Sequence, residues 1–230
     1  MPSRAAHRPA PGVIETWAPH LVVLAILGAA IGAFTSWRLG QEHSVAETFP
    51  LPDGESVAHF RPLKALPAIA DRWSDAGLVA VQAEGVRADG HVDASHATLR
   101  DPVVRYVFFR PTGHGEGTRI EVVVLPVGLD VQFAKVTQTV NAKFRLRSEG
   151  LVVSYTDGLR PAADEQAVDA PRCSVARLWG AMPTSTPLPA GTRANLTYRL
   201  DQYRLDFPSL GGGYVFDNTC RPLRSGRSPT

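Results

Sequence analysis

The chain has 230 residues, of which 44% are hydrophobic and 20% charged, and 24 Lys plus Arg face 22 Asp plus Glu. This composition can build a hydrophobic core, which excludes a disordered or collagen-like protein. The near-neutral charge balance leads us to expect no nucleic-acid partner. Two cysteines are too few for a zinc finger or a disulfide-dense scaffold.

An uncharged run of apolar and small residues, 21–34, lies near the amino terminus. As a helix this run alone would rise about 21 Å, which is short of the ~30 Å hydrocarbon core and suits a cleaved signal peptide. Trp17 and Trp37 flank the run, and a helix over 17–37 would be about 31 Å long with a tryptophan at each interface. We therefore predict a transmembrane helix over 17–37, with a cleaved signal peptide as the alternative.

The flanks of this segment indicate its orientation. Two arginines precede it and one, Arg38, follows it closely, which favours a cytoplasmic amino terminus and a periplasmic carboxyl-terminal domain at a bacterial inner membrane. Within the segment, Ala25, Gly28 and Gly32 supply small residues for close helix packing in lipid. The partners we expect are membrane lipid and other subunits of a membrane complex.

Changes of composition divide the rest of the chain. Residues 1–16 are expected to form a flexible cytoplasmic tail, 38–60 a proline-containing linker, and 221–230 a basic tail. The folded domain is then 61–220.

This domain has two possible halves, 61–160 and 171–220, each opening with a helical apolar stripe and continuing with β-branched and aromatic segments. Short helices are expected near 62–77 and 174–182, and 129–147 fits either a helix or a strand. The expected strands are 78–84, 103–110, 118–125, 151–155, 194–200, 203–207 and 211–217. The predicted fold class is α+β: a single amino-terminal transmembrane helix followed by a mainly antiparallel β ectodomain with two short helices.

The two halves repeat one arrangement. Trp73 and Trp179 each belong to a short expected helix that precedes antiparallel strands ending in aromatic residues. In this arrangement 62–110 and 173–220 resemble the small PepSY or cystatin-type α+β modules found outside bacterial membranes. The resemblance implies ligand or partner binding rather than catalysis.

The two cysteines flank the second half. Cys173 begins the second expected helix and Cys220 ends the last expected strand. In an oxidising compartment such a pair predicts a disulfide. Closing a loop of nearly fifty residues would add about 4 kcal/mol of stability in the chain-entropy model. Two buried thiols, or part of a metal site, are the alternatives.

No motif points to catalysis, since both Gly-x-Ser-x-Gly and Ser-x-x-Lys are missing from the sequence. His91, Asp93 and His96 follow a turn signal, and we interpret them as a solvated loop rather than as metal ligands. The glycine-rich residues 113–118 lie between two expected strands and lack phosphate-loop spacing, so they predict a hairpin. We assign no catalytic, cofactor-binding or metal-binding residue and expect that the chain is not an enzyme.

Three functions remain open at this point. The first is a non-catalytic, membrane-anchored accessory or assembly subunit whose periplasmic domain docks on a larger membrane complex. The alternative is an extracytoplasmic ligand-binding or sensory domain, and an envelope hydrolase or metal-dependent enzyme is the third. A ligand or partner surface could be formed by aromatic residues of the expected strands, namely Tyr106, Phe108, Tyr198 and Tyr203.

Overall fold

The structure is a computed structural model that describes residues 44–113, 115–126, 130–134, 141–145, 149–163, 165–183 and 188–227. These residues belong to one unit, His43–Thr230. The predicted tail 1–16 and the predicted membrane segment 17–37 lie outside the described residues, and so do Trp17, Ala25, Gly28, Gly32 and Trp37. None of the helices that the structure describes combines the length and the apolar character needed to cross a membrane.

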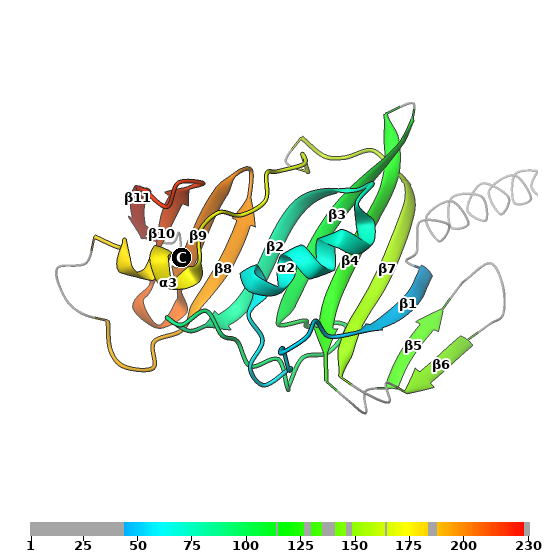
Figure 1. Ribbon diagram of the computed structural model, residues 1–230, viewed down its shortest axis with the longest axis horizontal. Coiled ribbons are helices and arrows are strands. Elements are labelled where there is room, and N and C mark those ends of the chain that lie inside the picture. The colour runs from blue at the N-terminus through cyan, green and yellow to red at the C-terminus, as the bar shows by residue number, and fades with distance from the viewer. Residues whose placement is uncertain are drawn as a thin grey trace, which may run out of the picture. The chain divides into compact units, whose positions relative to one another are not determined.

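A nine-stranded sheet dominates the domain (Figure 1), with the strand order β1-β7-β4-β3-β2-β8-β9-β10-β11. Every neighbouring pair in it is antiparallel. A separate hairpin pairs β5 (Asp130–Ala134) with β6 (Asn141–Arg145). The strands of the large sheet are β1 (Ser44–Pro50), β2 (Gly77–Val86), β3 (Val104–Gly113), β4 (Glu116–Leu125), β7 (Gly150–Leu159), β8 (Ala194–Arg199), β9 (Gln202–Phe207), β10 (Gly212–Asp217) and β11 (Pro222–Arg227).

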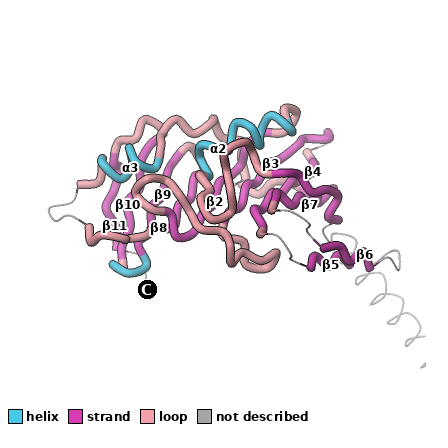
Figure 2. The backbone as a smooth tube through the Cα atoms, turned by 60° about the horizontal axis from the view of Figure 1, so that its bottom comes forward, coloured by secondary structure: helices cyan, strands magenta, loops and turns pink. Residues whose placement is uncertain are grey.

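Two short helices, α2 (Pro62–Ala70) and α3 (Val175–Gly180), lie on the same face of this sheet, as Figure 2 shows. Helix α2 begins with a proline, whose fixed φ and missing N–H suit the first turn of a helix. Helix α3 begins after Ser174, whose hydroxyl accepts a hydrogen bond from the Arg177 backbone N–H at 3.2 Å. Single turns of 3-10 helix, η1 (Asp71–Trp73) and η2 (Pro208–Leu210), follow α2 and β9.

The predicted α+β class is wrong, because helices of nine and six residues accompany one continuous antiparallel sheet. The first helix ends at Ala70 instead of near 77. Two segments expected to be irregular are strands: the predicted linker contains β1, and the predicted basic tail contains β11. Both are the outermost strands of the described sheet, and an outermost strand is where a sheet tolerates proline.

The sheet consists of two halves with the same topology. In the first half α2 is followed by β2, β3, β4 and β7, and in the second half α3 is followed by β8, β9, β10 and β11. The β5–β6 hairpin is inserted between β4 and β7 of the first half. The halves join where β2 pairs with β8, and Val81 lies opposite Tyr198 in this pair. The two parts suggested by the sequence therefore share one sheet.

The main core lies between this sheet and its helices. Side chains alternate along a strand, so every second residue of a strand such as β9 enters the core: Tyr203, Leu205 and Phe207 are each at most 2% exposed. The opposite face carries a smaller apolar cluster of Val79, Ala80 and Val107. Charged pairs flank that cluster, among them Arg105–Glu121 at 2.9 Å and Arg119–Glu165 at 2.8 Å.

Candidate functional site

The four aromatic residues that were candidates for a binding surface all lie in the core. Tyr106, Tyr198 and Tyr203 are 0% exposed and Phe108 is 1% exposed. Each occupies an inward position of its strand, beneath the segments that cover the sheet. None of these four side chains therefore lies on a surface that a partner or ligand could reach.

The three tyrosines instead fasten covering segments to the sheet. The Tyr106 hydroxyl donates to the Pro62 carbonyl at 2.9 Å and so fixes the start of α2. The Tyr198 hydroxyl donates to the Asp169 carbonyl at 2.8 Å, and the Tyr203 hydroxyl accepts from the Cys173 N–H at 2.9 Å. Burial raises the pKa of all three hydroxyls, so each stays protonated at neutral pH.

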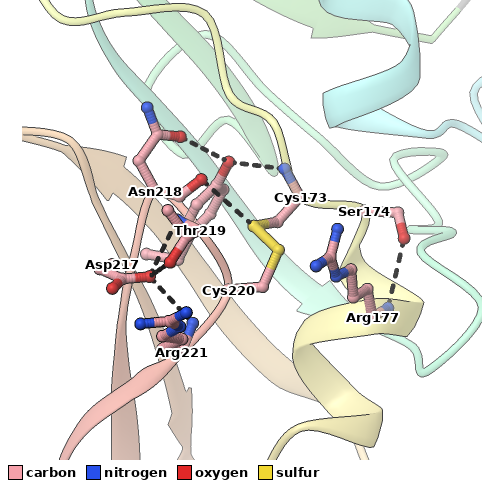
Figure 3. The surroundings of a disulfide bond; sticks show 9 residues. Cys173, Ser174, Arg177, Asp217, Asn218, Thr219, Cys220 and Arg221 are labelled. Atoms are coloured by element: carbon pink, nitrogen blue, oxygen red, sulfur yellow. Dashed lines mark hydrogen bonds between the residues drawn. A yellow bond between two sulfur atoms is a disulfide. The ribbon is translucent and has the colours of Figure 1, made fainter.

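The predicted disulfide between Cys173 and Cys220 is confirmed (Figure 3), with its two Cα atoms 5.8 Å apart. It joins the residue before the α3 cap to the turn between β10 and β11. Both cysteines are buried, at 3% and 5% exposure. The bond thus attaches the helix of the second half to that half's last hairpin.

The turn that presents Cys220 is organised by one carboxylate. Asp217 Oδ1 accepts hydrogen bonds from the Thr219 N–H at 2.8 Å, the Thr219 hydroxyl at 2.7 Å and the Arg221 N–H at 2.9 Å (Figure 3). These bonds, that of the Arg221 N–H first, hold the pKa of Asp217 below its usual value. They support a backbone in which Cys220 has a φ of +68°, in the left-handed region that few residues other than glycine adopt.

A cleft of about 410 Å³ lies between the beginnings of the two helices. We name it the seam cleft, because both halves line it: the start of α2 (Arg61, Leu63, Lys64), the loop after β2 (Asp89, Gly90) and residues 171–176. Three of its lining residues are cationic and one is anionic. No sequence pattern groups these residues, since the strand pairing that brings the halves together is long-range.

The charged side chains that line the seam cleft differ in the strength and burial of their ion pairs. The Arg61 guanidinium contacts Glu55, whose side chain is only 3% exposed, at 2.7 Å. Arg172 pairs with Asp169 at 3.7 Å, and both side chains are about 70% exposed. The backbone N–H of His91 lowers the pKa of Asp89, so this carboxylate is ionised at neutral pH.

The outer edge of β11 is the second candidate site, and we name it the carboxyl-terminal edge. Strand β11 pairs with β10 on one side, and no described strand pairs with it on the other. Leu223 of β11 is 48% exposed. The other strongly exposed large hydrophobic residues of the described chain, Leu200 and Leu210, also belong to the second half.

The histidine-containing loop has a local structural role. Asp93 accepts hydrogen bonds from the backbone N–H and the hydroxyl of Ser95, at 3.0 and 2.6 Å, which closes a turn. His91 contacts Asp89 at 3.3 Å, and His96 is exposed. Within the described part of the chain, no three His, Cys, Asp or Glu residues are grouped so that they could hold a metal ion.

Comparison of the chain with protein-family models, with curated proteins and with solved structures finds no match among any of them.

Proposed function

We propose that this chain is a non-catalytic accessory subunit whose disulfide-bonded domain docks, outside the cytoplasm, on another subunit of a membrane complex. One observation carries the proposal: β11 ends the sheet with one side unpaired by any described strand, and it exposes Leu223 there. An open edge can accept an extended segment of a second protein as a tenth strand. The apolar leucine would add buried area to the backbone hydrogen bonds of such a complex.

The composition of this edge favours a partner other than a second copy of the chain. Residues 221–227 include Arg221, Arg224 and Arg227 and no acidic residue. Two β11 strands paired with each other would bring these arginines together, and like charges on paired strands are unfavourable. An extended segment that carries Asp or Glu fits the same edge with complementary charge.

Two features support the proposed location. A buried disulfide such as Cys173–Cys220 is typical of proteins outside the reducing cytosol. The apolar segment 17–37 fits a membrane anchor by its length and its flanking tryptophans. We therefore propose that the protein resides in a bacterial inner membrane with this domain in the periplasm.

The test is recovery of the partner with and without the edge leucine. The tagged full chain is purified from native membranes in mild detergent, and the proteins present in stoichiometric amount are identified by mass spectrometry. Leu223→Glu is compared with Leu210→Glu, an equally exposed leucine outside β11 (51% against 48%). We expect one stoichiometric partner, reduced at least about tenfold by Leu223→Glu and unchanged by Leu210→Glu, because a charge at a docking strand opposes burial. A chain that purifies alone, or a partner that Leu223→Glu retains, contradicts the proposal.

A further inference from the structure

We infer that the seam cleft binds a small organic anion, a phosphate or carboxylate group carried on an apolar body. This inference is independent of the docking edge, since the cleft and β11 share no residue. The volume of the seam cleft, about 410 Å³, lies within the usual range of small-molecule sites, roughly 300–1,000 Å³. A bare phosphate would leave most of this space unfilled, so the ligand is larger than the ion alone.

The cleft offers both kinds of contact that such a ligand needs. Leu63, Pro171 and Val175 provide an apolar lining, and the cations Arg61, Lys64 and Arg172 line the same space. These cations come from two segments, the start of α2 and the segment before α3, so both halves of the sheet contribute positive charge to the cleft. Few converging polar groups in an otherwise apolar cleft are the usual pattern of small-molecule sites.

Two of the three cations can turn toward a ligand at little cost. No acidic side chain of the described residues forms an ion pair with Lys64, which is exposed on α2. Arg172 is 71% exposed, and its 3.7 Å pair with Asp169 joins two solvated side chains. Such pairs contribute little, so a ligand anion can replace Asp169 as the partner of Arg172. The third cation, Arg61, is held by Glu55, so it contributes to the positive electrostatic potential of the cleft without moving.

Both walls of the cleft are held in place without a ligand. On the α2 wall, Tyr106 binds the Pro62 carbonyl and Glu55 accepts from the Arg61 N–H at 2.8 Å. On the wall formed by residues 171–176, Cys173 is fixed through its disulfide and through the hydrogen bond from its N–H to the Tyr203 hydroxyl. A site that is already ordered loses less conformational entropy when it binds a ligand.

The single carboxylate of the cleft, Asp89, allows the sign of the ligand's charge to be tested. Its carboxylate lines the cleft, is about 60% exposed and is engaged by His91. It therefore opposes an anionic ligand while Lys64 and Arg172 attract it. Removing this charge must strengthen binding if the ligand is an anion, whereas reversal of Lys64 or Arg172 must weaken it.

The experiment titrates n-butyl phosphate, butyrate and 1-butanol into the purified full chain in mild detergent and follows ligand saturation-transfer NMR. The variants are Lys64→Glu, Arg172→Glu and Asp89→Asn. Arg160→Glu is the matched control, because Arg160 is 79% exposed, forms a similar 3.7 Å pair with Glu116 and lies outside the cleft. Near-ultraviolet circular dichroism checks that each variant is folded.

We expect saturable binding of at least one anion and none of 1-butanol. Affinity should fall about tenfold in Lys64→Glu and in Arg172→Glu, rise about threefold in Asp89→Asn, and stay unchanged in Arg160→Glu. Whether the phosphate or the carboxylate binds more tightly identifies the anionic group. The inference is overturned if no anion saturates, if 1-butanol binds equally well, or if the two charge reversals leave affinity unchanged.

Discussion

The two halves of the sheet have one topology, but they are held together by different means. The first half carries the nine-residue α2 and a Trp73 that is 4% exposed, and β1 pairs with its last strand, β7. The second half carries the six-residue α3, no described strand pairs with the outer side of its last strand β11, and a disulfide ties the helix to the final hairpin. A helix of less than two turns buries little apolar surface, so packing alone stabilises its attachment to the sheet only weakly. The disulfide adds stability to this attachment.

Equivalent aromatic pairs show this difference at the level of single residues. Trp73 packs on Phe108 in the first half, with ring centres 5.7 Å apart, and Trp179 packs on Phe207 in the second, at 5.2 Å. Trp73 also donates its indole N–H to the Tyr155 hydroxyl at 3.2 Å. Trp179 is only partly buried. A tryptophan–phenylalanine contact thus joins helix and sheet in both halves, tilted in the first and edge-on in the second, and the tryptophan of the first half is the more buried.

The largest effect is expected from shortening these tryptophans. Trp73→Ala should lower the free energy of unfolding by about 3–5 kcal/mol, the usual cost of removing a buried aromatic side chain. Trp179→Ala should cost about half as much, because part of its ring already contacts water. Urea denaturation of the full chain with its disulfide intact measures both. Equal losses would show that the two tryptophans contribute equally to stability and that the halves do not differ in this respect.

Removal of the disulfide should come next. Its cysteines are 47 residues apart, so Cys173→Ser with Cys220→Ser should cost up to about 4 kcal/mol, reduced by any strain in the native bond. Amide hydrogen exchange should accelerate first in β9, β10 and β11, while β3 and β4 keep their protection. In the unmodified protein both thiols should react with maleimide only after reduction. Labelling without reductant would contradict both the bond and the proposed location.

The buried tyrosines should have a smaller effect that depends on pH. Burial and the hydrogen bond to Asp201 raise the pKa of Tyr198, and burial raises that of Tyr106. The folded state therefore keeps protons that the unfolded chain releases above about pH 10, so this stability is present below pH 10 and is lost as pH rises further. Tyr106→Phe should cost about 1–3 kcal/mol at neutral pH, because the Pro62 carbonyl loses its partner.

Tyr106→Phe and Tyr198→Phe should each also flatten the loss of stability above pH 10. Thermal unfolding between pH 7 and pH 11 measures both effects. Variants that lose stability with pH as steeply as the unmodified protein would show that these hydroxyls do not titrate with folding.

Local patterns in the sequence predicted several elements well, because their causes are local. Pro62 and the apolar spacing after it indicate α2. The alternation on either side of Asp201 indicates the β8–β9 hairpin, whose turn residues are Leu200 and Asp201. The cysteine pair was also predictable, since only two cysteines are present. Pairing between β2 and β8 depends on packing across the whole domain, so no short sequence segment predicts it.

The candidate sites were harder to predict for the same reason. A tyrosine on a strand can face a ligand or the core, and only the register assigns Tyr106 and Tyr198 to the core. The arginines and the proline of β11 are typical of a solvated tail and also of a protected edge strand, so composition cannot separate the two. Lys64 and Arg172 meet at one cleft only because the two halves share a sheet.

The smallest expected effect concerns the turn that presents the open edge of the second half. Asp217→Ala removes the acceptor of three hydrogen bonds, so the amides of Thr219 and Arg221 should exchange faster while the first half is unchanged. The lowered pKa of Asp217 means that this contribution is present above about pH 4 and is lost as pH falls through the folded value.

The unmodified protein at acidic pH should therefore show the same local exchange as Asp217→Ala at neutral pH. Hydrogen exchange at pH 7 and at a pH well below 4, where Asp217 is protonated in the folded protein, corrected for intrinsic rates, compares them. If β11 is a docking strand, this variant should also weaken partner recovery less than Leu223→Glu does, because it loosens the edge without placing a charge on it. A stronger loss with Asp217→Ala would mean that the geometry of the turn, rather than the exposed leucine, determines docking.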